Sequence, residues 1–297
     1  MRLSTLLIIL TFLNLVSCTT KTQDDQSIIL FSYEELSRQK IYNDTNALPK
    51  NLDSVYRLDL SEQQLTKIPE IVSKLNNLQE LNLSKNNLSN LNGIENLNYL
   101  QVLSIGMNNF KTFPSEIIKL KNLKSLSVWW NSIKTFPDEF FSENIKIEEL
   151  DMTSMFEFDF KSNLNKIHSF KNLTKLNLGN NQIPYLTVQF DKLENLEVFG
   201  YIRQNSIDLK ELCLKLANCK KLKTVHFSAN NIKELPNEIL LLESLEELNL
   251  FENKIQSLPT DIVKMKNLKE ISLIDNPVDE SKIEDIENKM PQTEIIY

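Results

Sequence analysis

The chain has 297 residues, of which 41% are hydrophobic and 25% are charged, with a formal net charge of −7 and an isoelectric point of about 5.2. This length and apolar content suffice for a large core in one or two domains. The acidic balance argues against nucleic-acid binding, which needs a basic surface. Because there are only four glycines and two histidines, and no GxGxxG or Walker-type motif, we expect no phosphate loop, metal site or other cofactor.

Residues 1–17 have the pattern of a leader. Arg2 supplies a positive start, and the apolar run over residues 3–16 is short for a membrane span. The run ends in Leu15-Val16-Ser17-Cys18, which resembles the lipobox of bacterial lipoproteins. That resemblance implies cleavage before Cys18 and acylation of Cys18, hence a lipid anchor in a membrane. An ordinary secretory signal with an incidental cysteine is the alternative.

The segment after the leader is expected to be a flexible tether over residues 18–30, because residues 19–26 are polar and cannot pack. Ser32-Tyr33-Glu34-Glu35 has the spacing of a capping box and predicts a short helix to about residue 40. We interpret residues 31–54 as an N-terminal cap over the first repeat, since a solenoid must cover its terminal core.

Ten repeats are expected over residues 55–280. Within each, buried and exposed positions alternate, as Leu248 and Leu250 do with Glu247, Asn249 and Phe251, which predicts a short strand. The first positions of the repeats are 22 to 26 residues apart and are Val55, Leu78, Leu100, Leu123, Ile147, Leu173, Leu196, Leu222, Leu245 and Leu268.

This pattern resembles the leucine-rich-repeat family, in the 23-residue LxxLxLxxNxLxxLP form common in bacteria and in Ras-associated scaffolds. The resemblance implies an α/β solenoid shaped like a horseshoe, with a parallel sheet on the concave side and irregular or short helical turns on the convex side. Residues 281–297, with a helix over about 281–289, resemble the C-terminal cap of that family. We expect no catalytic domain after this cap.

The ninth position of each repeat is a structural column. An asparagine there can bond backbone groups of adjacent turns. Met155 takes this position in the fifth repeat and cannot bond, so we expect an irregular bend there, followed by a bulge over residues 156–160. Gln63 and Gln204 occupy it in the first and seventh repeats. The asparagines are Asn86, Asn108, Asn131, Asn181, Asn230, Asn253 and Asn276.

Two cysteines within the repeats are expected to be core residues. Cys213 lies in the apolar helical stripe between Leu209 and Leu216, and Cys219 fills a leucine position. A disulfide between them is the alternative, although a spacing of six residues puts them on different faces of a helix.

The concave surface is the expected site of function. Ten strands about 4.8 Å apart give an arc of about 45 Å, which suits a protein partner better than a metabolite. On the positions that face this surface or its rim, acidic side chains outnumber basic ones nine to four, which again disfavours nucleic acid.

The predicted partner-binding residues fall into two patches and one histidine. Trp129 should point into the concave surface with Trp130 beside it, unless one tryptophan packs inward against the neighbouring turn. Exposed tryptophan is typical of binding hot spots. His226 could be drawn into a Ser228–His226–acid arrangement, but we expect a solvated or contact residue and no catalytic site. The full set is Met107, Trp129, Trp130, Ile202, Arg203, His226 and Phe251.

The sequence therefore predicts a non-enzymatic binding module. We expect a monomer that is anchored by lipid in the bacterial cell envelope, at the outer membrane or cell surface, and that binds a protein or a glycan. One alternative is an intracellular leucine-rich-repeat signalling scaffold of the Ras-associated type. Another is an envelope enzyme that uses the acidic concave residues.

Overall fold

The computed structural model describes residues 29–183, 186–204 and 207–297. The predicted leader over residues 1–17, the predicted lipidation site Cys18 and all but the last two residues of the predicted tether lie outside the described residues. In the described part of the chain, no helix combines the length and the apolar character needed to cross a membrane.

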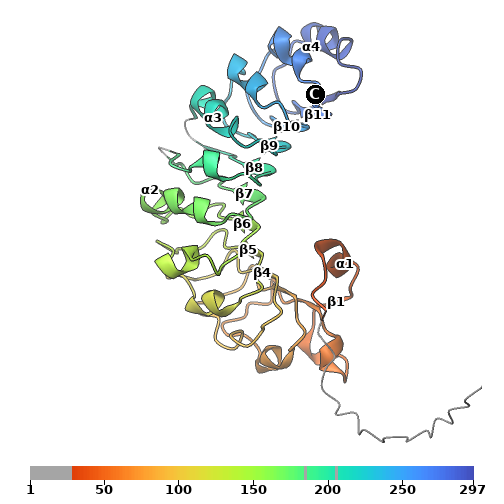
Figure 1. The fold of residues 1–297 in the computed structure, drawn as a ribbon. Coiled ribbons are helices and arrows are strands. Elements are labelled where there is room, and N and C mark those ends of the chain that lie inside the picture. The colour runs from red at the N-terminus through yellow and green to blue at the C-terminus, as the bar shows by residue number, and fades with distance from the viewer. Residues whose placement is uncertain (1–28, 184–185, 205–206) are drawn as a thin grey trace, which may run out of the picture.

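A single parallel sheet organises the described residues. Its twelve strands follow the order of the sequence and line the inner side of an arc (Figure 1). The predicted parallel concave sheet is confirmed. The strands are β1 (Ile41–Tyr42), β2 (Arg57–Asp59), β3 (Glu80–Asn82), β4 (Val102–Ser104), β5 (Ser125–Ser127), β6 (Glu149–Asp151), β7 (Lys175–Asn177), β8 (Val198–Gly200), β9 (Thr224–His226), β10 (Glu247–Asn249), β11 (Glu270–Ser272) and β12 (Glu294–Ile296).

Each repeat strand pairs with the same three positions of the next strand, as Glu247, Leu248 and Asn249 pair with the corresponding residues of β11, whereas β1 pairs with β2 through two residues. The ten repeats supply β2 to β11, and the two caps add β1 and β12. The sheet is therefore wider than the ten strands expected from the repeats.

Short helices form the convex side, as expected. Proline precedes five of the 3₁₀ helices as the N-cap residue, where its fixed φ starts the return path. The α-helices are α1 (Tyr33–Ser37), α2 (Phe160–Asn163), α3 (Leu209–Leu216) and α4 (Glu280–Glu287). The 3₁₀ helices are η1 (Thr45–Ala47), η2 (Leu52–Ser54), η3 (Glu70–Lys74), η4 (Ser115–Lys119), η5 (Asp138–Phe141), η6 (Leu164–Ser169), η7 (Phe190–Lys192), η8 (Asn237–Leu241) and η9 (Thr260–Lys264).

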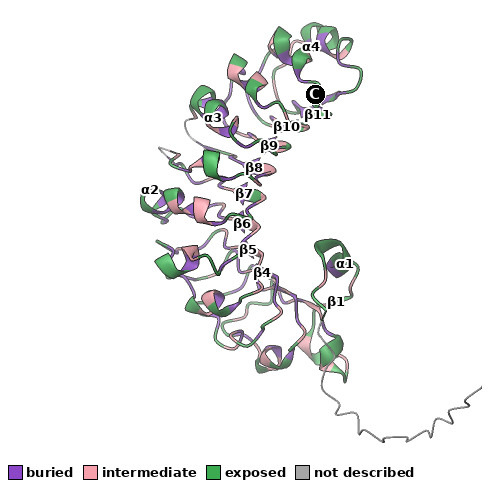
Figure 2. Cartoon of the chain, viewed as in Figure 1, coloured by how far each residue is buried: buried purple, intermediate pink, exposed green. Residues whose placement is uncertain are grey.

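The core runs without interruption between the sheet and the convex side (Figure 2). The central residue of each repeat strand is buried. In the fourth and fifth repeats the core is aromatic: the ring of Phe140 lies 4.6 Å from that of Phe113 and 5.2 Å from those of Phe136 and Phe170, measured between centroids. Phe158, in the expected bulge, packs 4.8 Å from Phe136.

The predicted capping box of α1 is confirmed. The Glu35 N–H donates to the Ser32 hydroxyl at 3.2 Å, and the Ser32 N–H donates to the Glu35 carboxylate at 2.8 Å. The helix itself is shorter than expected and ends at Ser37.

Both described cysteines are buried and free, so no disulfide joins them. Cys213 lies on α3, whereas Cys219 follows that helix and donates from its thiol to the Phe190 carbonyl at 3.4 Å. Burial raises the pKa of each thiol to about 12. Because the thiolate is the reactive form, these two side chains act as packing residues.

Candidate binding surface

The eighth position of every repeat has a left-handed backbone. The φ angles lie between 51° and 59° at Glu62, Lys85, Met107, Trp130, Ser154, Asn180, Arg203, Ala229, Glu252 and Asp275. Non-glycine residues rarely adopt this conformation unless the surrounding structure imposes it. In eight of the ten repeats an asparagine or glutamine at the ninth position links the turn to the backbone of the preceding repeat.

Asn253 shows how the ninth position works. Its side-chain oxygen accepts from the backbone N–H groups of Asn230 at 2.9 Å and Ile232 at 3.0 Å, both in the preceding repeat. Its amide donates to the carbonyls of Phe227 at 3.0 Å and Leu250 at 2.8 Å. Asn86, Asn108, Asn131, Asn181, Gln204, Asn230 and Asn276 likewise bond backbone groups of the preceding repeat, and all but Asn230 also bond carbonyls of their own turn.

The expected irregular bend at Met155 is wrong. Ser154 has a φ of 58°, like its equivalents in the other repeats. The Met155 side chain is fully buried in the core, and its N–H donates to the Asn181 side chain of the next repeat at 2.6 Å. The neighbouring repeat therefore holds this turn in the usual shape.

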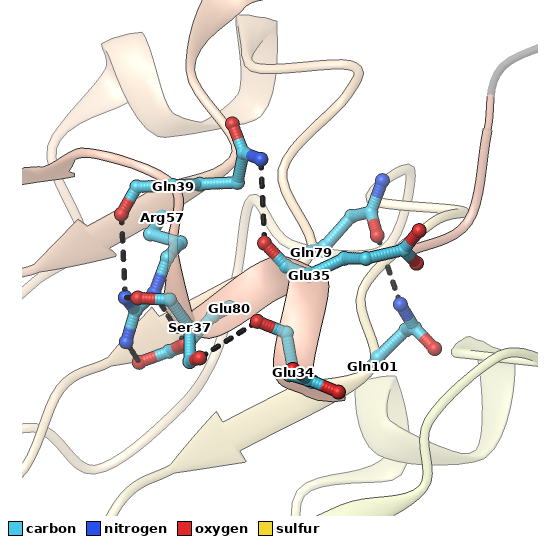
Figure 3. A network of polar contacts seen from close by, with 8 residues as sticks. All are labelled: Glu34, Glu35, Ser37, Gln39, Arg57, Gln79, Glu80 and Gln101. Atoms are coloured by element: carbon cyan, nitrogen blue, oxygen red, sulfur yellow. Dashed lines mark hydrogen bonds and ion pairs between the residues drawn. The ribbon is translucent and has the colours of Figure 1, made fainter. Parts of the chain in front are cut away.

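The N-terminal segment, residues 29–40, lies on the concave side of the arc (Figure 1). Arg57 on β2 forms a two-point ion pair with Glu80 on β3, at 2.7 and 3.0 Å. The same guanidinium donates to the carbonyls of Ser37 at 2.8 Å and Gln39 at 3.3 Å (Figure 3). The carbonyl-rich end of α1 is thus fixed by a cation on the sheet.

Two buried glutamines bind the extended start of this segment. Gln79 accepts from the Phe31 N–H at 3.0 Å and donates to the Ile29 carbonyl at 2.8 Å. Gln101 donates to the Phe31 carbonyl at 2.9 Å and to the Gln79 side chain at 2.8 Å (Figure 3). The two glutamines are 0% and 2% exposed, so the segment covers them completely.

Tyr33 is the residue of the N-terminal segment that lies next to the fifth repeat. Burial, then the nearby charges of Glu149 and Glu148, raise the pKa of its phenol above the usual range. The Lys124 ammonium lies 5.9 Å from its ring centroid. The segment therefore reaches from the first repeat to the fifth, whereas the sequence predicted a cap over the first repeat alone.

A depression of about 340 Å³ lies in the concave sheet beyond this segment. The side chains that line it come from β5 to β9, and we call it the concave depression. Its polar residues are Ser125, Ser127, Glu149, Asp151, Lys175, Asn177 and His226, and it also includes Val198 and Gly200.

Trp129 is half-buried and lies flat on the concave side of the sheet. A Cβ atom placed on Gly106 would lie 1.9 Å from the Trp129 Nε1 atom, so the indole occupies the space that a side chain on β4's turn would fill. Trp129 therefore rests against the concave side of the sheet and does not enter the core. Trp130, by contrast, is 50% exposed.

Two exposed aromatic side chains meet at the rim where the strands end, and an exposed methionine lies on the neighbouring turn. The ring of Trp130 lies 5.8 Å from that of Phe156, at 81°, and the Met107 N–H donates to the Trp129 carbonyl at 2.7 Å. Met107, Trp130 and Phe156 are 44%, 50% and 54% exposed; we call them the aromatic rim patch. Phe156 was not predicted as a contact residue, although its place in an expected bulge indicated that its side chain could be exposed.

The second predicted patch is more polar than expected. Ile202 and Phe251 are half-buried, whereas Arg203 is exposed and lies 3.5 Å from the Glu252 carboxylate. These residues share one rim with the aromatic rim patch, because Arg203 and Glu252 also occupy the eighth position.

His226 is half-buried on β9 rather than exposed. Desolvation lowers its pKa, against the opposing effect of Glu247, so its ring is neutral at pH 7. The Ser228 hydroxyl donates to the Asn249 side chain at 2.8 Å, so it is not poised against His226 for catalysis. Among the described residues, no group of three or more His, Cys, Asp or Glu side chains is placed to hold a metal ion.

Comparisons with known proteins agree with this geometry. The family model described as leucine rich repeat matches residues 220–278, and an internalin of Listeria monocytogenes superposes with a TM-score of 0.52. The chain folds as a leucine-rich-repeat solenoid. The internalin is 20% identical, and the match covers 82% of this chain and 81% of the internalin, a likeness that shows the fold alone.

Two further proteins resemble this leucine-rich-repeat solenoid. A leucine-rich-repeat protein of Leptospira interrogans is 22% identical, with 87% of this chain and all of that one covered, at a TM-score of 0.39. A Dictyostelium discoideum protein described as the probable inactive serine/threonine-protein kinase roco10 is 29% identical over 199 residues, which is 63% of this chain. The chain spans about 6% of the length of that relative.

Proposed function

We propose that this protein is a non-enzymatic, protein-binding leucine-rich-repeat module that works as a monomer on the bacterial cell envelope. In this proposal acyl chains on Cys18 hold it at the outer membrane or the cell surface. The partner binds the concave face, and the predicted residues Met107, Trp129, Trp130 and Phe251 contribute to that contact.

The main support for the binding proposal is the length of the concave face that the N-terminal segment does not cover. The N-terminal segment bonds Arg57, Gln79 and Gln101 and approaches Glu148 just before β6; within the described residues it forms no hydrogen bond with β5 to β11, which remain open. Seven strands about 4.8 Å apart span about 30 Å, the scale of a protein surface rather than of a metabolite. Exposed tryptophan and arginine at the rim are the residue types that dominate the energy of protein interfaces.

Cross-linking of the full chain in its host envelope, followed by mass spectrometry, identifies the partner and the contact residues. We expect cross-links on the concave face and on the aromatic rim patch. The variant Trp130→Ala should then weaken binding by about tenfold or more, since truncating a hot-spot residue costs about 2 kcal/mol or more. Leu241→Ala removes a similarly exposed side chain from η8 on the convex side and should leave affinity unchanged. Equal affinity for all three proteins would count against the proposed surface.

The anchor is tested separately by growth with labelled palmitate. We expect label on the wild-type protein and none on the Cys18→Ala variant. An unlabelled wild-type protein would contradict lipidation and would favour the intracellular scaffold over an envelope protein.

A further inference from the structure

The concave depression lies where the N-terminal segment stops. Tyr33 lies near the carboxylates of Glu148 and Glu149, and Glu149 also lines the depression. Up to this point the sheet edge already holds an extended polypeptide, because Gln79 and Gln101 bond the backbone of Phe31. The depression is therefore the first uncovered part of a surface that binds extended chain.

One residue in the floor of the depression is a glycine, Gly200. A Cβ atom on Gly200 would lie 2.8 Å from the Asn177 Oδ1 atom, and one on Gly179 would lie 3.3 Å from the same atom. Any side chain at Gly200 would force Asn177 to move. Gly200 thus gives the Asn177 side chain room to lie against the sheet, which keeps this part of the floor low.

The charge of the depression is negative. Its only ammonium group, that of Lys175, is paired with Glu149 at 2.7 Å, and His226 is neutral at pH 7. Asp151 forms no ion pair within the described residues, so its carboxylate carries an uncompensated charge. Its Oδ2 atom accepts from the Ser127 hydroxyl at 2.9 Å, and its Oδ1 atom accepts from the N–H of Thr153 at 3.1 Å and its hydroxyl at 2.7 Å.

These hydrogen bonds fix the Asp151 carboxylate in place before a ligand arrives, which lowers the entropic cost of binding. Further along the sheet, Glu247, Glu270 and Glu294 lie side by side in register. In the described part of the chain none of these three glutamates forms an ion pair. Their summed field attracts a positively charged partner toward the same face.

From the glycine floor, the fixed carboxylate and the neighbouring bound segment, we infer that the concave depression receives a lysine or arginine side chain from an extended segment of the protein partner. Asp151 is the main contact and Glu149 a secondary one. This inference rests on the proposed function and names the chemistry of the partner.

The four glycines of the sequence allow a direct test by NMR. Protein labelled with ¹⁵N at glycine alone gives four backbone amide signals, from Gly93, Gly106, Gly179 and Gly200. The probe is a blocked decapeptide of glycine and serine with one central arginine; the matched probe carries citrulline, its neutral isostere. We expect the arginine peptide to shift the Gly200 and Gly179 signals saturably, with Gly93 unmoved. The citrulline peptide should shift none of them at the same concentration.

Two isosteric variants separate local recognition from general attraction. Asp151→Asn should weaken binding of the arginine peptide by about three- to tenfold, the range for a partly exposed charge-assisted contact. Asp59→Asn is the control, because Asp59 has the same place on β2 and likewise accepts an N–H two residues later, from Ser61 at 2.9 Å. If Asp151→Asn disturbs folding, Glu149→Gln is measured in its place and should also weaken binding.

Several outcomes would overturn the inference: unmoved Gly200 and Gly179 signals, equal shifts by the two peptides, or equal losses in Asp151→Asn and Asp59→Asn. The proposed function fails differently. If the cross-linked partner contacts the concave face only outside the depression, the binding proposal stands and this inference falls. If the partner contacts only the convex side, the binding proposal itself falls.

Discussion

At the scale of a single residue, Asn253 shows how the ninth position of a repeat stabilises the fold. It satisfies two backbone N–H groups and at least two carbonyls in the interior of a tight turn. Buried backbone groups without partners are costly, each by about 1–3 kcal/mol. An apolar side chain of similar size cannot replace these bonds.

We expect Asn253→Ala to lower the free energy of unfolding by about 3 kcal/mol, measured by urea denaturation followed by circular dichroism. Asn267→Ala is the matched control, because Asn267 is exposed and donates one bond, to the Glu243 carbonyl at 2.8 Å. That variant should change the free energy by less than about 1 kcal/mol. Similar losses in the two variants would contradict a special role for the ninth position.

Gly106 offers a second test at the same scale. An added methyl group would overlap the Trp129 indole, so the ring must leave its place on the sheet. In a Trp130→Phe background, Gly106→Ala should shift the fluorescence emission of Trp129 to longer wavelength, because the ring becomes more exposed. Gly179→Ala, two repeats further from this ring, should leave the emission unchanged. Unaltered emission in Gly106→Ala would show that the indole does not rest on Gly106.

The N-terminal segment is the element that departs most from what the sequence predicts. From Ser32 and Glu35 the sequence predicted a capped helix in this segment. It did not predict that the segment extends along the concave side from the first repeat to the fifth. Its bonds to Gln79 and Gln101 join residues 48 to 70 positions apart. Two glutamines in otherwise ordinary repeats give no pattern that marks them as partners of a distant backbone.

The double variant Gln79→Ala with Gln101→Ala should release the N-terminal segment without unfolding the repeats. We expect hydrogen–deuterium exchange over residues 29–40 to accelerate by at least about tenfold, because these amides lose the contacts that order them. The repeat strands should exchange as before. Glu246→Ala changes a residue that precedes β10 beyond the reach of the segment, and serves as the control. Unchanged exchange over residues 29–40 would mean that Arg57 and Tyr33 hold the segment by themselves.

At the scale of the whole molecule, the repeat register, the sheet and the turn positions could be read from the sequence because each repeat is a local pattern that recurs. The candidate site was only partly predictable. The orientation of Trp129 depends on Gly106 in the previous repeat, and the shape of the depression depends on Gly200, against which Asn177 of the previous repeat lies. Such features arise between repeats, where no single pattern records them.

Stability should also behave as a property of neighbouring repeats, since each coil contacts only the next. Phe140→Ala removes the ring at the centre of the aromatic core of the fourth and fifth repeats. We expect a loss of about 3–5 kcal/mol, and calorimetry should show the single heat-absorption peak divide in two as the halves uncouple. Phe156→Ala, an exposed ring, should keep one peak. A single, merely shifted peak for Phe140→Ala would indicate a molecule that unfolds as one unit.

The left-handed turns of the eighth position have a consequence for how this protein can change. Ten turns share one backbone shape, although their side chains are as different as Trp130, Lys85 and Ala229. In eight of the ten repeats the residue that follows the turn makes the stabilising hydrogen bonds, so the turn residue itself has few structural constraints. Mutations at these ten positions can change the side chains along one edge of the solenoid, one repeat at a time, while the fold is kept. Such an edge is well suited to following a partner that itself evolves.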